Sequence, residues 1–179
     1  MRIGFVDCMT NDADVFEAAN NAAAEVSPNV SLQRFTAPDL LKIPVCAKKL
    51  LAAGADVALA FITVSEEDVD SFQLLLERAI DVELATEKFV FFCAVGKDEY
   101  RTAEQMTVIA ERRLKAYLDL IVKLELNPNA VSSQIGEEIN PDLAMLGAGM
   151  AALAGATPEE SGKTQPNLLS DDETGKSLF

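Results

Sequence analysis

The sequence predicts an α/β domain in which helices cover both faces of a parallel sheet, and two observations lead to this fold class. Short segments rich in Val, Ile and Phe alternate along the chain with longer segments whose apolar residues recur at helical spacing. Three of the four strand-like segments are apolar at nearly every position, as expected for strands that are buried on both faces. This alternating order predicts right-handed crossovers between parallel strands.

The expected strands cover residues 2–7, 30–35, 56–62 and 88–95. The second segment, "VSLQRF", alternates between polar and apolar side chains, which indicates a strand at the edge of the sheet. The other three segments lack this alternation. We therefore expect them to lie beneath helices on both sides.

Four helices are expected between and after these strands. The first carries an apolar stripe from Val15 to Val26. The second begins near Pro44, which suits a first helical turn, and ends near Gly54. The third follows the acidic segment "SEEDVD", which suits the positive end of a helix dipole. The fourth follows "TAEQ", residues 102–105, whose spacing predicts a capping box.

The chain is expected to hold one α/β domain, formed by residues 1–126. Residues 127–156 would add a loop-rich connection and a small-residue helix, "DLAMLGAGMAALAGA", to the same domain. Residues 157–179 are rich in Pro, Ser, Gly and acidic side chains and show little periodicity. This composition predicts a disordered, acidic tail.

Gly147, Gly149 and Ala152 fit the spacing of the G-x-G-x-x-A dinucleotide fingerprint. That motif has to follow a strand and open a helix, whereas here it lies inside a helical pattern. The pattern therefore favours the alternative reading, a helix whose small residues allow close approach to a neighbouring subunit.

The composition argues against several classes of function. Lys and Arg number 15 and Asp and Glu 29, so the net charge is −14, which disfavours nucleic acid and anionic membranes as partners. No apolar run is long enough to cross a bilayer, and "MRIGFVDC" begins directly as a strand without a signal peptide. We therefore expect a cytoplasmic location. With no histidine and three widely spaced cysteines, neither a metal site nor a disulfide framework is expected.

Ligands of parallel α/β sheets bind beyond the carboxyl ends of the strands. The loops at those ends are "CMTND", "TAPDLLKIP", "TVSEED" and "GKDEYRT", and none is a glycine-rich phosphate cradle. They offer hydroxyl groups and backbone amides instead. The candidate groups are the hydroxyls of Thr10, Thr36, Thr63 and Ser65 and the amides around Asp39 and Leu40.

Four sequence features together resemble a known family. They are Asp7 in the first strand, Asp14 in the following helix, the R-x-T-x-P strand end followed by "IPVCAKKLL", and the strand "ADVALAF" before an acidic helix. On these features, residues 2–124 resemble the archaeal-type riboflavin synthases, which are relatives of lumazine synthase. More weakly, "LGAGMAALAG" is similar to the C-terminal helix of that family.

The resemblance implies a flavodoxin-like, three-layer α/β/α fold with a four-stranded parallel sheet in the order 2-1-3-4 and a C-terminal helix. It implies a homo-oligomer, a pentamer, with sites between adjacent subunits and with no metal or organic cofactor. The reaction implied is the dismutation of two molecules of 6,7-dimethyl-8-ribityllumazine to riboflavin and a pyrimidinedione. The alternative is a non-catalytic relative that keeps the oligomer as a scaffold or as a flavin-binding shell.

The resemblance also assigns residues to a bound lumazine or flavin. It places Thr10 near the ring and puts Pro38, Asp39 and Leu40 where main-chain groups hold the ribityl chain. Thr10 stands where the family often has an aromatic residue, and Asp39 stands where it has glycine. Two alternatives stay open, because Thr10 could cap the first helix and Asp39 could simply accept hydrogen bonds within its turn.

The same resemblance places Thr63 and Val64 beneath the ring, and Phe61 where the related strand carries glycine. Gln73 or its neighbour stands near the histidine of the family's third helix. A neutral glutamine cannot take up a proton near pH 7, and general acid–base help is worth about 10² to 10⁴ in rate. No catalytic residue is therefore assigned from the sequence.

Overall fold

The computed structural model describes residues 1–127. The predicted connection, small-residue helix and tail, residues 128–179, lie outside the described residues. The described elements are β1 (Arg2–Cys8), α1 (Phe16–Val26), β2 (Ser31–Ala37), the short 3₁₀ helix η1 (Leu40–Lys42), α2 (Ile43–Ala52), β3 (Val57–Val64), the short 3₁₀ helix η2 (Glu66–Asp68), α3 (Val69–Thr86), β4 (Val90–Gly96) and α4 (Ala103–Leu126).

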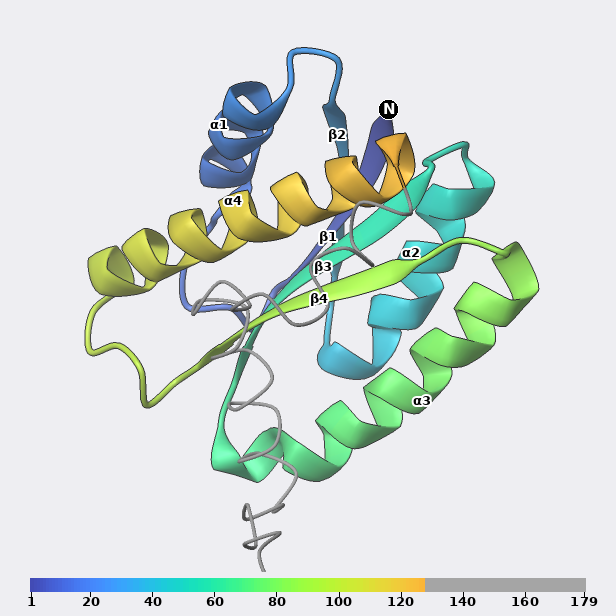
Figure 1. Cartoon of the computed structure of the whole chain (residues 1–179). Helices are drawn as coiled ribbons and strands as arrows, with labels where there is room; N and C mark the ends of the chain where they lie inside the picture. Colours follow the sequence, from blue (N-terminus) through green and yellow to red (C-terminus); the bar gives the residue numbers. More distant parts are fainter. Residues whose placement is uncertain (128–179) are drawn as a thin grey trace, which may run out of the picture.

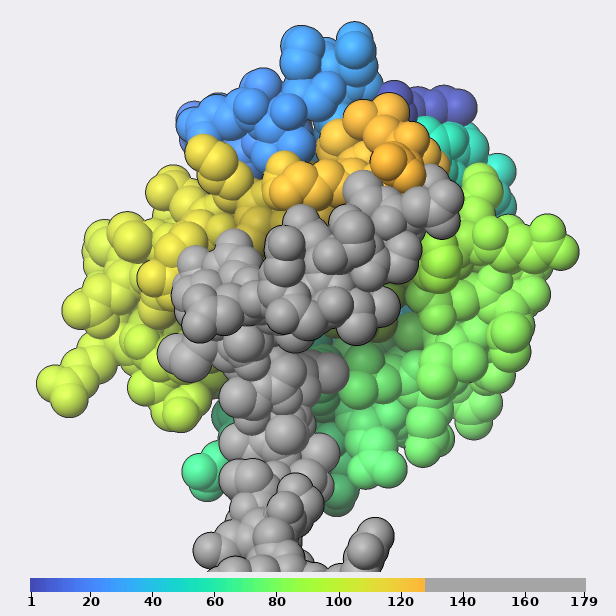
Figure 2. Space-filling model, in the orientation of Figure 1, coloured from blue at the N-terminus to red at the C-terminus, as the bar shows by residue number. Residues whose placement is uncertain are grey.

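The four strands form one parallel sheet in the order β2-β1-β3-β4. Helices α1 and α4 pack on one face, and α2 and α3 pack on the other (Figure 1). In the space-filling view, α4, in yellow to orange, and α3, in green, form opposite flanks of the molecule (Figure 2). The predicted three-layer fold and its strand order are confirmed.

Burial follows the predicted roles of the strands. All eight residues of β3 are buried, because this strand lies inside the sheet and beneath both helix layers. β2 stands at an edge, and four of its seven residues are exposed. The edge position predicted from "VSLQRF" is therefore confirmed.

The helix boundaries agree with the predicted signals, with one correction. Pro44 lies in the first turn of α2, and Gly54, just past its end, has a φ of +99° that side chains disfavour. The hydroxyl of Thr102 accepts a hydrogen bond from the Gln105 amide at 3.3 Å. The Gln105 side chain accepts from the amide of Arg101 and not from that of Thr102. The predicted capping box is thus only half formed.

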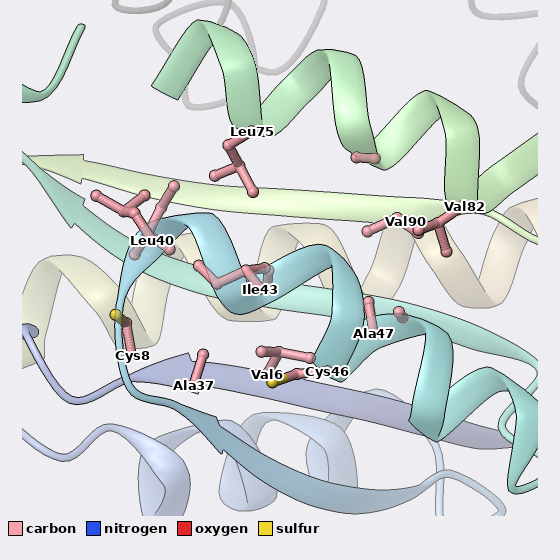
Figure 3. Close-up of a cluster of buried hydrophobic side chains, with 14 of the residues drawn as sticks. Val6, Cys8, Ala37, Leu40, Ile43, Cys46, Ala47, Leu75, Val82 and Val90 are labelled. Carbon is pink, nitrogen blue, oxygen red and sulfur yellow. The ribbon is translucent and has the colours of Figure 1, made fainter. Parts of the chain in front are cut away.

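Two apolar clusters make up the core, one on each side of the sheet. Figure 3 shows the cluster beneath α2 and α3, in which Cys8, Ala37 and Leu40 lie toward one end and Val82 and Val90 toward the other. Cys46 belongs to this cluster, and Cys93 lies in the cluster beneath α1 and α4. Both cysteines are core residues as predicted, and burial raises the pKa of the Cys93 thiol to about 12. Within residues 1–127, no helix has the length and apolar character needed to cross a membrane.

Candidate functional site at the carboxyl edge of the sheet

The carboxyl ends of all four strands meet at one edge of the sheet, because every pair of neighbouring strands is parallel. This edge, called the carboxyl edge below, carries the loops after Cys8, Ala37, Val64 and Gly96. It therefore brings together most of the residues that the resemblance assigns to a ligand. Gln73 is exposed near the start of α3.

The corner at Pro38–Asp39–Leu40 opens η1 and leads into α2. Asp39 caps η1, because its carboxylate oxygen Oδ1 accepts a hydrogen bond from the Lys42 amide at 3.1 Å. Pro38 and Asp39 are exposed and Leu40 is buried. The turn hydrogen bond of Asp39 is thus confirmed, while its contact with a ligand stays a prediction.

The backbone at this corner retains hydrogen-bonding capacity. The first amides of a helix have no carbonyl partner within that helix. Among residues 1–127, the amides of Leu40 and Leu41 accordingly have no backbone acceptor. The Met9 amide donates to the Ala37 carbonyl at 2.8 Å, which holds the loop after β1 beside this corner.

Thr10 is exposed in the loop after β1, and its hydroxyl oxygen lies 3.0 Å from the Cys8 sulfur. It does not cap α1, so that alternative is wrong. The carboxylate of Asp14 accepts from the Phe16 amide at 2.9 Å instead. Asp14 thus precedes α1, and the expectation that it lies within the helix is corrected.

Thr63 and Val64 are buried at the end of β3. The Thr63 amide donates to the side-chain oxygen of Asn11 at 2.9 Å, and the Asn11 side-chain nitrogen donates to the Phe61 carbonyl at 3.2 Å. Asn11 therefore ties the loop after β1 to the end of β3. Thr63 and Val64 are thus enclosed, and the prediction that they lie beneath a bound ring stays a prediction.

Tyr100 links the loop after β4 to the loop after β1. Its hydroxyl donates to the Asp12 carboxylate and interacts with the side chain of Thr63. Burial, with the hydrogen bond to Asp12 and the charge of Asp12, raises the pKa of Tyr100 to about 12. The phenol therefore stays a neutral donor across the physiological pH range.

Asp7 and Asp14 share one cation. The Arg34 guanidinium binds the Asp7 carboxylate and, at 2.9 Å, the Asp14 carboxylate, and it lies 5.1 Å from the centroid of the Phe16 ring. The hydrogen bond from the Phe16 amide and that from Arg34 hold the pKa of Asp14 below its usual value. The Asp7 side chain is 6% exposed, and its oxygen Oδ1 has no hydrogen-bond partner among the described residues.

A buried ion pair supports the loop that carries Tyr100. The Arg113 guanidinium, 7% exposed, donates to the Ala94 carbonyl at 2.7 Å and to the Glu99 carboxylate at 3.1 Å. The same carboxylate accepts from the Gly96 amide at 2.7 Å. These contacts hold the turn between β4 and α4, in which Glu99 immediately precedes Tyr100.

The residues that the sequence reasoning missed are Asn11, Asp12, Arg34 and Tyr100. Asn11, Asp12 and Tyr100 lie within the loop segments "CMTND" and "GKDEYRT", so position was the only available signal. Arg34 belongs to the R-x-T-x-P strand end. Together these side chains tie the central loop after β1 to its neighbours on both sides. Residues 1–127 hold no group of three or more Cys, Asp or Glu side chains placed to bind a metal ion.

Comparison with known proteins finds similarity to riboflavin synthases. No family model matches the chain. A riboflavin synthase from Archaeoglobus fulgidus is 26% identical over 139 residues, which cover 76% of this chain and 90% of that protein. A riboflavin synthase from Aeropyrum pernix is 24% identical over 137 residues, which cover 75% and 88% of the two chains. The chain is therefore similar to riboflavin synthases from these two organisms, and the family resemblance predicted from its sequence is confirmed.

Proposed function

We propose that the protein is a riboflavin synthase-type transferase that dismutates two molecules of 6,7-dimethyl-8-ribityllumazine. One molecule gives a four-carbon unit to the other, so that riboflavin and a pyrimidinedione form without an external oxidant. The observation that carries this proposal is the match to two proteins named riboflavin synthase over about nine tenths of their length. The strand order and the meeting of the four strand-end loops at the carboxyl edge are consistent with it.

The corner after β2 supplies groups suited to the ribityl chain of this substrate. The amides of Leu40 and Leu41 are donors, and the exposed carboxylate of Asp39 is an acceptor for hydroxyl groups. Thr10 would lie near the ring, with Thr63 and Val64 beneath it. Gln73 would approach from α3 as a neutral hydrogen-bonding group.

Positioning would carry most of the catalysis in this site. Two identical substrates have to react with each other, and holding them in register can remove about 7 to 11 kcal/mol of a bimolecular barrier. The chain has no histidine to carry protons. We therefore propose that catalysis relies on the orientation of the two substrates. The absence of histidine is also the observation that favours the second candidate function, a non-catalytic flavin-binding shell.

The test incubates the purified full-length chain with 6,7-dimethyl-8-ribityllumazine and follows riboflavin by chromatography with fluorescence detection. We expect riboflavin and the pyrimidinedione in equal amounts, at a rate proportional to protein concentration. The control is a mock purification from host cells that lack the gene. Tight lumazine or riboflavin binding without turnover would support the flavin-binding shell, and the absence of both would reject the two candidates together.

We also propose that the chain assembles into a homo-oligomer, a pentamer, through the groove between α2 and α3. This groove, about 390 Å³ in volume, is lined mainly by apolar side chains. Val45, Leu41 and Leu74 in its lining are 53%, 45% and 39% exposed. Neighbouring apolar side chains that are exposed together in this way are typical of a protein–protein contact surface. A second copy of the chain would cover this surface and place neighbouring carboxyl edges close together. The cytoplasmic location expected from the sequence stays a prediction.

Replacing Val45 by aspartate is expected to dissociate the oligomer, because the carboxylate would lose its water in a closed and mainly apolar contact. The measurement is the molar mass in solution by light scattering at matched protein concentration. Val108→Asp on α4 is the control, since Val108 is 66% exposed and lies outside the groove. Equal masses for V45D and V108D would contradict the proposed interface.

A further inference from the structure

Thr63 is expected beneath the ring of a bound ligand, yet the structure encloses it. The residue is 2% exposed, although it stands next to the last position of β3, at the carboxyl edge. Phe61, two positions earlier in the strand, belongs to the cluster beneath α1 and α4, so the Thr63 side chain points to the same face of the sheet. A ring can therefore contact Thr63 only after the groups around it move.

Two side chains from different loops contact Thr63. Asn11, in the loop after β1, accepts a hydrogen bond from the Thr63 amide at 2.9 Å and donates to the Phe61 carbonyl at 3.2 Å. Tyr100, in the loop after β4, interacts through its hydroxyl with the Thr63 side chain. Asn11 is thus fastened to the backbone of β3 at two points, whereas the Tyr100 hydroxyl is held by side chains. The Tyr100 side of the enclosure is therefore the one that opens more easily.

The hydrogen bond from Tyr100 to Asp12 crosses the end of β3. Asp12 belongs to the loop after β1, and β3 lies between β1 and β4 in the sheet. Asp12 is exposed and Tyr100 is partly exposed, so water is available to both groups as soon as they separate. The Tyr100 ring itself packs against the cluster beneath α1 and α4. The ring thus anchors the residue, and the hydroxyl joins the two loops over Thr63.

We propose that the hydrogen bond between Tyr100 and Asp12 is a latch over the lumazine site, and that it opens to admit the ring of the ligand to Thr63. This inference rests on the proposed function, which supplies the ligand. In the structure the latch is closed, because the phenol and the carboxylate bind each other. A ligand that binds the open form alone has its apparent affinity reduced by the fraction of molecules that are closed. The latch therefore opposes binding, unlike a residue that contacts the ligand.

The experiment compares the full-length chain with Tyr100→Phe, which removes the hydroxyl and keeps the ring. Fluorescence titration gives the dissociation constants of riboflavin and of 6,7-dimethyl-8-ribityllumazine, and stopped-flow fluorescence gives their association rates. We expect Tyr100→Phe to bind both ligands about three- to tenfold more tightly and to associate faster, because opening no longer breaks a charge-assisted hydrogen bond. A purely structural role of this hydroxyl predicts the opposite sign, weaker binding.

Two further variants make the test specific. Tyr117→Phe is the matched control, because Tyr117 packs against the same cluster but lies in the middle of α4, and it is expected to bind both ligands as the parent does. Asp12→Ala removes the other half of the latch and should tighten binding as Tyr100→Phe does. The double variant should bind no more tightly than either single variant, since both substitutions remove the same hydrogen bond.

The outcomes separate the latch from the proposed function. If the parent binds both ligands and Tyr100→Phe binds them equally well or more weakly, the latch is rejected while the proposed function stands. Additive tightening in the double variant would also reject it, because the two residues would then act separately. Binding that appears in Tyr100→Phe but not in the parent would support the latch. If no variant binds either ligand, the proposed function fails, and the latch fails with it.

Discussion

Replacing Glu99 by alanine is expected to lower the free energy of unfolding by about 3 to 5 kcal/mol, as for other buried ion pairs that lose one partner. The Arg113 guanidinium, 7% exposed, would remain charged, with the Ala94 carbonyl as its one remaining acceptor among residues 1–127. The Gly96 amide would lose its carboxylate acceptor as well. Urea unfolding at neutral pH and fixed protein concentration measures the change.

The opposite substitution, Arg113→Met, is expected to destabilise less. It removes the buried charge and leaves Glu99, which is 35% exposed, with water and the Gly96 amide. Glu25→Ala breaks the ion pair with Lys115, in which both side chains are more than half exposed, so its effect should stay within about 1 kcal/mol. Equal losses for E99A and E25A would show that the ion pair of Arg113 does not support the loop.

Replacing Arg34 by methionine is expected to be as damaging, by about 3 to 5 kcal/mol, because it isolates a buried carboxylate. Asp7 would lose the partner of its oxygen Oδ2, while Oδ1 already has none among the described residues. The loop after β1 would also lose the tie between Arg34 and Asp14. Thermal and urea unfolding report the stability, and riboflavin titration reports the condition of the carboxyl edge.

A double substitution separates charge isolation from the loss of packing on Phe16. Asp7→Asn with Arg34→Met removes both charges, so we expect it to recover more than half of the stability lost by Arg34→Met alone. Asp14→Asn is the matched control, because Asp14 is 62% exposed and its charge is solvated. Additive losses in the double variant would mean that packing, and not the buried charge, explains the effect.

The strands of the sheet could be predicted closely from the sequence, because burial on both faces restricts which residues a strand can contain. Strands inside a parallel sheet need apolar residues at nearly every position, and "DVALAFI" shows this pattern. The expected strands differ from β1, β2, β3 and β4 by no more than two residues at either end. The strand order came from the family resemblance, since local patterns carry no information about which strands are neighbours.

The candidate site was predictable only as far as its loops. Parallel strands determine which loops share an edge, and this rule placed Asp39 and Thr63 at the carboxyl edge, where the structure has them. The direction of a loop side chain depends on partners that are distant in sequence. Asn11, for example, binds Thr63 across 52 positions, and Tyr100 binds Asp12 across 88. For this reason the inward contact of Thr10 could not be read from "CMTND".

The three buried cysteines can serve as probes of local opening motions in the protein. All three thiols are buried, with Cys8 and Cys46 beneath one helix layer and Cys93 beneath the other. A thiol-modifying reagent reaches each sulfur only when the helices above it move away. The order in which the three sulfurs are modified therefore shows which helix layer moves away from the sheet first. No probe has to be introduced by mutation.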